Sequence, residues 1–408
     1  MAIQRPKLKL ERGKTYVIDQ SDATNATHPF KFTADSGTSE YTSGVTASGT
    51  PGQAGAKTTF VVPSNAPDNM MYYCTTHGIG MGQKIKIFGT PAAAFAWGGA
   101  RGFNLGGITQ NPTAKLNNID YWVIATPGNS QDFGDLTTAR QAMAAMSSGT
   151  RGIVAGGYES AVSTALNQMQ YITCATLGNG TDFGDLTWAT FYGAGHSNGT
   201  KGFYSGGQRA SEGSYGYVNT IDQIAIATTG NATDVADLTL ARGGGDQGTN
   251  DASRAIHIGG QSAAQREDVI DYFSMDTTAN AVDFGDMASG ARVRGATGSD
   301  TTYGIIAGGR RTGSSHSNDW TENIDRITIQ TPGNSTDYGD LTTFYENMSG
   351  ASDNTYMTMA GAAGNDGSSN VRYNVIERIT IATPGNAADF GDLLQTTEDG
   401  AGLSGNAA

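Results

Sequence analysis

The segment "DFGDL" at residues 132–136 decides the fold, because it returns five more times along the chain at nearly constant intervals. The later copies begin at residues 182, 234, 283, 337 and 389 and read "DFGDL", "DVADL", "DFGDM", "DYGDL" and "DFGDL". Successive starts differ by 50, 52, 49, 54 and 52 residues. A fixed period of this length is typical of a fold built from repeated supersecondary units.

Two further sequence motifs recur with the same period. "RGFNLGG" begins at residue 101, and its counterparts begin at 151, 201, 254, 303 and 356. "IDYWVIATPGNS" at 119–130 returns as "IDRITIQTPGNS" at 324–335. Each unit holds a small-residue segment, an apolar segment that ends in Gly-Gly, an alternating segment and a short segment. Four strands in a period of this length predict one blade of a β-propeller, with the small residues nearest the axis.

These repeats resemble those of kelch-type propellers in the Gly-Gly ending, the alternating strand after it and the outer "DFGDL" turn and strand. The resemblance implies a six-bladed kelch-like propeller over residues 91–408. The chain departs from the kelch pattern at the outer strand, where aromatic residues other than the usual Trp stand: Phe133, Phe183, Phe284, Tyr338 and Phe390. We expect these rings to fill the space between neighbouring blades.

The two ends of this region compete for one place in the propeller. "AAAFAWGGA" at 92–100 and "GAGLSGNAA" at 400–408 both resemble the axial strand, although six blades need only one of them. We expect the first to be used, because it would form a local hairpin with "RGFNLGG".

Residues 1–90 show no internal repeat. Alternating segments such as "KLKLERGKTYVID" at 7–19 and "QKIKIFG" at 83–89 predict the strands of a small β-sandwich. Pro91 and the alanine-rich segment that follows it mark the boundary to the repeats. No sustained helical periodicity interrupts either region, so the whole chain is predicted to be all-β.

One loop of the first region carries metal-binding side chains. "MYYCTTHGIGMG" at 71–82 sets Cys74, His77 and Met81 close together, and His28 lies 74 − 28 = 46 residues before the cysteine. A type-1 copper ion takes two imidazoles, one thiolate and a weak axial thioether. This region resembles a cupredoxin such as plastocyanin over about its whole length, which implies one copper bound by His28, Cys74, His77 and Met81. The alternative is a copper-free scaffold that keeps only the outline of the loop.

The remaining candidate ligands are scattered. His196, His257 and His316 fall in different repeats without a shared offset, and we expect them at the surface or in blade loops. Asn and Asp of each turn, such as Asn129, Asp132 and Asp135, could bind Ca²⁺, but such residues more often bond the backbone of their own turn. A nucleophile–base pair is not evident, so we expect no enzyme. A copper oxidase like galactose oxidase would need a Tyr–Cys cross-link and two His that this pattern does not supply.

The amino-acid composition limits the classes of partner that we expect. The formal net charge is −13, which disfavours nucleic acid and anionic membranes. The N-terminus lacks the apolar core of a signal peptide, and no apolar run is long enough to span a bilayer, so we expect synthesis in a cytoplasm.

The tandem "IATPGNA" and "DFGDL" phrases after a cupredoxin-like module resemble virion structural proteins of tailed phages, especially those of marine cyanobacteria. That resemblance implies a tail, fibre or surface-decoration component, assembled in the host cytoplasm and present in several copies per particle. Its partners would be other virion proteins and a host-surface glycan or protein. The alternative is an electron-transfer copper protein with a propeller docking domain.

Overall fold

A computed structural model describes residues 6–11, 14–34, 39–63, 66–67, 69–88, 97–159, 164–211, 214–244, 248–312, 319–365 and 369–407. The chain divides into two compact units, Met1–Ala94 and Phe95–Ala408. Apart from the single 3-10 turn η1 (Ala23–Asn25), the elements in the described ranges are β-strands, so the fold is all-β as predicted. Within these described ranges, no helix has the length and apolar character needed to cross a bilayer. The expected boundary at residues 91–96 lies outside the described residues.

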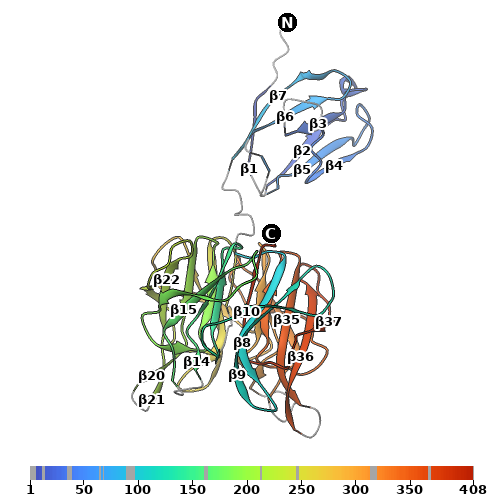
Figure 1. The fold of residues 1–408 in the computed structure, drawn as a ribbon. Helices are drawn as coiled ribbons and strands as arrows, with labels where there is room; N and C mark the ends of the chain where they lie inside the picture. The colour runs from blue at the N-terminus through green and yellow to red at the C-terminus, as the bar shows by residue number, and fades with distance from the viewer. Residues whose placement is uncertain are drawn as a thin grey trace. The chain divides into compact units, whose positions relative to one another are not determined.

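The N-terminal unit consists of two sheets, drawn in blue in Figure 1. Its core is the apolar face of the alternating strands, where Phe32, Phe60 and Ile85 have at most 1% of their surface exposed. The first sheet has the order β1 (Leu8–Glu11), β7 (Gly78–Phe88), β6 (Asn69–Cys74), β3 (Phe30–Thr33), with β1 parallel to β7. The second has the order β2 (Thr15–Asp19), β5 (Lys57–Val61), β4 (Val45–Ser48).

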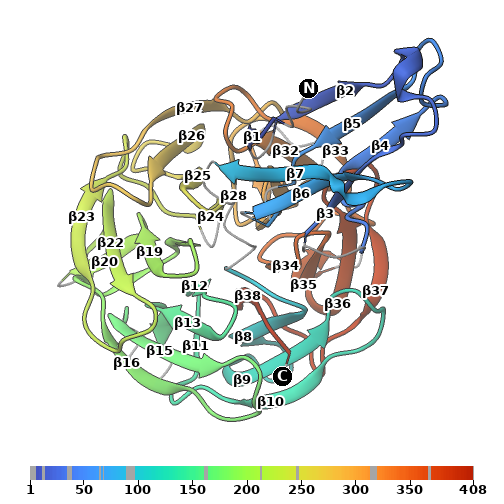
Figure 2. The same cartoon turned by 90° about the horizontal axis from the view of Figure 1, so that it is seen from above.

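The second unit holds, within the described residues, six four-stranded antiparallel sheets that stand in a ring (Figure 2). We number them 1 to 6 and list each from its inner to its outer strand. Sheet 1 is β38 (Ala401–Gly405), β8 (Arg101–Thr109), β9 (Ala114–Val123), β10 (Gln131–Asp135); sheet 2 is β12 (Ala144–Ser147), β13 (Arg151–Ala155), β15 (Gln168–Thr173), β16 (Thr181–Asp185); sheet 3 is β18 (Ala194–Ser197), β19 (Lys201–Ser205), β22 (Thr220–Ala225), β23 (Thr233–Asp237).

Sheets 4 to 6 follow the same order. Sheet 4 is β24 (Gly248–Asn250), β25 (Arg254–Gln261), β26 (Arg266–Ser274), β27 (Val282–Asp286); sheet 5 is β29 (Ala296–Ser299), β30 (Tyr303–Ala307), β32 (Asn323–Thr328), β33 (Thr336–Asp340); sheet 6 is β34 (Ser349–Ser352), β35 (Tyr356–Asn365), β36 (Asn370–Thr380), β37 (Ala388–Asp392). In the part of the unit that the structure describes, three small ribbons join loops: β11 (Arg140–Gln141) with β14 (Tyr158–Glu159); β17 (Thr190–Phe191) with β20 (Gln208–Ser211) and β21 (Ser214–Tyr217); β28 (Arg292–Val293) with β31 (Arg310–Arg311).

The core of this unit lies between the sheets. Each of six apolar clusters takes its residues from two neighbouring sheets, and the last joins sheet 6 back to sheet 1. The outer aromatic residues lie in these clusters as expected; Phe133 of sheet 1, for example, packs with Val154 and Ile172 of sheet 2. Burial between sheets explains why one repeat alone could not be stable.

The inner strands approach one another closely. A Cβ atom placed on Gly195 would lie 2.0 Å from the carbonyl oxygen of Ala145 in the neighbouring inner strand. Gly350 has the same relation to Thr297, also at 2.0 Å. The small residues at these positions are therefore required by backbone packing at the axis.

A closed circle of backbone hydrogen bonds stands where the inner strands begin, and we call its residues the axial ring. Each N–H donates to the carbonyl of the equivalent residue one sheet earlier, over 2.7–3.0 Å. Five of the six residues are not glycine and have φ between 55° and 64°, a left-handed backbone that costs energy outside glycine. The ring consists of Ala142, Tyr192, Gly244, Arg294, Asn347 and Asp399.

The expectation for ring closure was wrong. The C-terminal strand β38 is the inner strand of sheet 1, where Leu403 pairs with Phe103, and not the segment at 92–100. The spacing of the repeat gives the reason, since 144 − 136 = 8 residues lead from Leu136 to the next inner strand and 401 − 393 = 8 lead from Leu393 to β38. The last repeat therefore continues as the others do.

Candidate metal centre

The predicted metal loop is the turn between β6 and β7. Cys74 ends β6 and pairs with Gly78, while the His77 N–H donates to the Cys74 carbonyl over 3.2 Å. β3 begins opposite, with Phe30 paired to Cys74, so that His28 reaches the same place from two residues before β3. The Thr76 hydroxyl donates to the Thr27 carbonyl over 2.6 Å. Strand register therefore brings together two segments 46 residues apart.

Three ligand atoms converge at this turn. Cys74 Sγ lies 3.6 Å from His28 Nδ1 and 3.7 Å from His77 Nδ1, and one ligand atom from each of the three side chains lies within 4.8 Å of the other two. The two imidazole rings stack with centroids 4.7 Å apart. Cys74 is buried, His28 is half-buried and His77 is exposed. The arrangement offers a soft thiolate from inside and two imidazoles toward solvent.

These separations suit one small transition-metal ion. With metal–sulfur and metal–nitrogen bonds of about 2.3 and 2.0–2.1 Å, sulfur and nitrogen ligands of one ion stand roughly 3.5–3.8 Å apart. Both measured sulfur–nitrogen distances fall in that range. Among the residues that the structure describes, this is the one group of three His, Cys, Asp or Glu side chains able to hold a metal.

Met81 is the fourth predicted ligand. It lies in β7, and 37% of its surface is exposed. The three ligand atoms that converge belong to His28, Cys74 and His77. Its role as an axial ligand therefore remains a prediction.

Two histidines expected at the surface are buried. His196 and His257 have 1% and 2% of their surface exposed, and both contact the hydroxyl of Ser205 through ring nitrogens at 2.8 Å. Burial lowers the pKa of His196 to about 4 and that of His257 well below its usual value. They were misassigned because β19, β18 and β25 bring them together only in three dimensions. His316 lies outside the described residues.

The polar turn residues bond backbone, but of the neighbouring sheet. The Asn129 side-chain oxygen accepts from the Asp392 N–H over 3.2 Å, and Asn179 accepts from Asp135 over 3.0 Å. Four further bonds of this kind, of 3.1, 3.1, 3.0 and 3.1 Å, join the remaining sheets: Asn231 to Asp185, Asn280 to Asp237, Asn334 to Asp286 and Asn386 to Asp340. The asparagines thus connect sheets, where we expected bonds within one turn.

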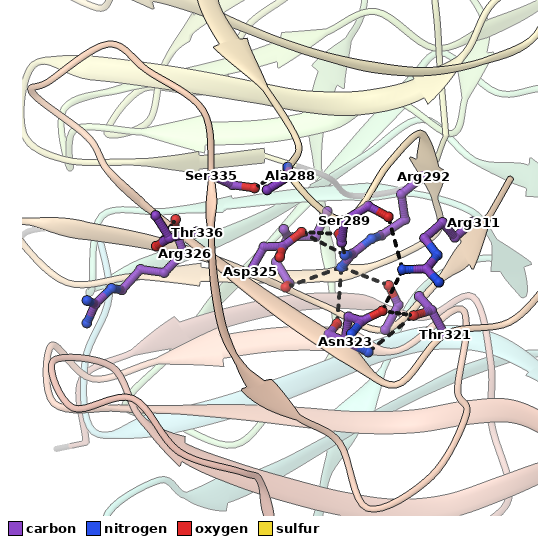
Figure 3. A network of polar contacts seen from close by, with 12 residues as sticks. Ala288, Ser289, Arg292, Arg311, Thr321, Asn323, Asp325, Arg326, Ser335 and Thr336 are labelled. Atoms are coloured by element: carbon purple, nitrogen blue, oxygen red, sulfur yellow. Dashed lines mark hydrogen bonds and ion pairs between the residues drawn. The ribbon is translucent and has the colours of Figure 1, made fainter. Parts of the chain in front are cut away.

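Buried ion pairs between sheets escaped the sequence analysis. Arg242 after β23 contacts Asp271 of β26 over 2.9 Å, and both side chains are fully buried. Arg292 contacts Asp325 over 2.8 Å in the same way, within a network that includes Ser289 and Asn323 (Figure 3). The signal was present, since the acid recurs in the "ID" phrase, and Arg242 and Arg292 follow "ADL" and "GDM" by four and five residues.

The chain matches no protein-family model and no curated protein sequence. The interpretation of its sites therefore rests on their geometry and chemistry.

Proposed function

We propose that the N-terminal unit is a cupredoxin-like module that binds one copper ion at a type-1 centre. The observation that carries this proposal is the convergence of one ligand atom each from His28, Cys74 and His77 within 4.8 Å. Thiolate and imidazole ligands suit copper, and a buried sulfur beside two more exposed rings gives electrons a short route between the metal and the surface. Met81 would be the axial ligand, because it follows in the strand that leaves the loop.

Copper titration of the full chain tests this proposal. One equivalent of Cu²⁺ should bind and give an intense visible band, since the Cys74 thiolate would transfer charge to the metal. Cys74→Ala should abolish the band. Cys174→Ala is the matched control, because Cys174 is fully buried in the sheet ring and burial raises its thiol pKa to about 12. A wild-type chain that stays colourless and metal-free in excess copper would contradict the proposal.

For the second unit we propose a six-bladed kelch-like propeller that acts as a binding scaffold in a phage virion, as a tail, fibre or surface-decoration component. Support comes from the closed axial ring and from bonds that run from each sheet to the next, which together make a rigid platform for loops. Its partners would be other virion proteins and a host-surface glycan or protein. Locating the chain in intact particles by cryo-electron microscopy tests this role, and its absence from purified particles would exclude it.

A further inference from the structure

A cavity of about 250 Å³ opens beside the axial ring, on the side where the inner strands begin. Its walls come from sheets 3, 4 and 5 and their ribbons. Tyr192 follows β17, Tyr217 ends β21, Arg266 begins β26, Arg294 follows β28 and Arg310 begins β31. Residues more than 100 positions apart thus meet in one hollow.

The charge of this cavity is opposite to that of the chain. The sequence has 38 acidic and 25 basic residues, yet the described lining contains three arginines and no aspartate or glutamate. Arg266 pairs with Asp319 over 3.0 Å. Arg294 and Arg310 share the single carboxylate of Glu346, at 3.6 and 3.7 Å, distances too long for good hydrogen bonds. Asp399 and Glu398 also lie close enough to act on Arg294, but none of these carboxylates lines the cavity, so the charged side chains that face it are the arginines.

In the described part of the chain, the Arg310–Glu346 ion pair leaves two buried atoms without a hydrogen bond. Arg310 Nε and Glu346 Oε2 are buried without a hydrogen-bond partner among the described residues. Arg310 Nε lies 3.7 Å from Glu346 Oε2, beyond hydrogen-bond distance, and buried polar atoms usually have partners, so this nitrogen can take a further acceptor at the cavity wall. Arginine presents a planar fork that matches carboxylate in two-point contact.

Arg294 is positioned by the axial ring. Its backbone has φ of 64°, and its Nη2 lies 3.5 Å from the Tyr192 hydroxyl, which in turn contacts Asp399 Oδ2 over 3.3 Å. The guanidinium also lies over the Tyr192 ring, 5.3 Å from its centroid. Strained backbone held by surrounding contacts is often found at binding sites.

From this geometry we propose that the cavity binds a carboxylate-bearing sugar residue, such as a uronic acid of an acidic polysaccharide. Arg294 and Arg310 would hold the carboxylate, Tyr192 and Tyr217 would contact the ring, and the side chain of Gln208 would bond its hydroxyl groups. The volume lies just under the range of about 300–1,000 Å³ usual for drug-sized ligands, which suits one sugar residue at a time. The inference gives a ligand class to the proposed attachment role and rests on that role only for its biological meaning.

Calorimetric titration of the full chain with an oligoglucuronate of four residues tests this proposal. The acidic oligomer should bind, a neutral glucose oligomer of equal length should not, and Arg310→Gln should weaken binding at least tenfold. Arg209→Gln is the matched control: it removes the same charge from β20 next to Gln208, but Arg209 lies over Trp188, at 4.2 Å from the ring, and does not line the cavity.

Three outcomes would overturn the proposal: no binding of oligoglucuronate by the folded chain, equal losses in Arg310→Gln and Arg209→Gln, or inorganic sulfate that binds as tightly as the oligomer. The last result would mean a general anion site. Because these titrations use purified protein, their failure is distinguishable from absence of the chain from a virion. If Arg310→Gln unfolds, Tyr217→Ala provides a second variant, expected to weaken binding of the oligomer and to leave the copper titration unchanged.

Discussion

At the scale of single residues, the histidines lie in two kinds of surroundings: a turn of the first unit and the buried interior of the sheet ring. Cys74 and His77 lie in one turn, so their spacing alone indicates a shared site. His28 could be added because a β-sandwich with few histidines offers a single candidate. His196 and His257 could not be paired, because their link through Ser205 depends on how two neighbouring sheets meet.

The buried histidines should make the stability of the ring depend on acid. The unfolded chain takes up protons near pH 6.5, whereas His196 in the native state does so only near pH 4. The free energy of unfolding therefore keeps its full value above pH 6.5 and decreases as the pH falls toward 4, by about 3 kcal/mol for His196. Urea unfolding at several pH values should show a shallower acid slope for the double variant His196→Gln/His257→Gln.

The control for this measurement is His77→Gln, which removes an exposed histidine. Its acid slope should match that of the wild type. Equal slopes in the double variant and the wild type would mean that the buried pair is not the source of the acid sensitivity.

The buried ion pairs predict a difference between two otherwise equivalent aspartates. Asp271→Asn leaves the fully buried Arg242 without its counter-charge and should cost about 3–5 kcal/mol. Asp222 occupies the same repeat position but faces a segment in which Thr190 replaces the arginine. Asp222→Asn can still accept from the Thr187 N–H, now 2.8 Å from its carboxylate, and should cost about 1 kcal/mol. Calorimetric unfolding of both variants measures the difference, and equal losses would refute the assignment.

At the scale of elements, one Arg or Lys side chain of each sheet donates a hydrogen bond to a backbone carbonyl of the next sheet. Arg101 reaches the carbonyl of Cys174 over 2.9 Å and lies over Tyr121. In sheet 5 the two partners are exchanged: Tyr303 starts the second strand, and Arg326 on the third strand reaches Ala382 over 3.1 Å. The repeat positions could be predicted from the period. The hydrogen bond between sheets could not, because its acceptor is a backbone carbonyl that carries no sequence signal.

This exchange predicts a rescue. Arg326→Tyr alone removes a charge-assisted hydrogen bond and a cation–π contact at a partly exposed site, and should destabilise the ring by about 1 kcal/mol. Adding Tyr303→Arg rebuilds the arrangement of Arg101 and Tyr121 and should recover most of that loss. Scanning calorimetry compares the midpoints, with Tyr303→Arg alone as the control. A double variant less stable than Arg326→Tyr would show that the two orientations are not equivalent.

At the scale of the whole molecule, the number of repeats was readable from the sequence, but the closure was not. Six markers in phase account for the six sheets, and the alternating segments before residue 90 account for the strands of the first unit. The two candidate closing segments have similar compositions, and a preference for local pairing chose the wrong one. Packing decides for β38, because its inner-strand neighbours are β12 and β34 on either side.

We expect that β38, the strand that closes the ring, can be deleted from the chain and replaced by a separate peptide. Deleting residues 400–408 removes the inner partner of β8, together with Leu403, which is 5% exposed, and the Ser404 hydroxyl that donates to the Ser352 carbonyl over 2.6 Å. Loss of one buried leucine alone costs about 2–5 kcal/mol, so the truncated chain should melt well below the wild type and with a broader transition. A peptide of residues 396–407 in excess should restore the sharp transition, because binding to the folded state alone raises its stability by mass action. The same peptide with Leu403→Asp should not, since it would bury a charge between sheets 1 and 2. A truncated chain that melts like the wild type without peptide would mean that the ring does not depend on its last strand.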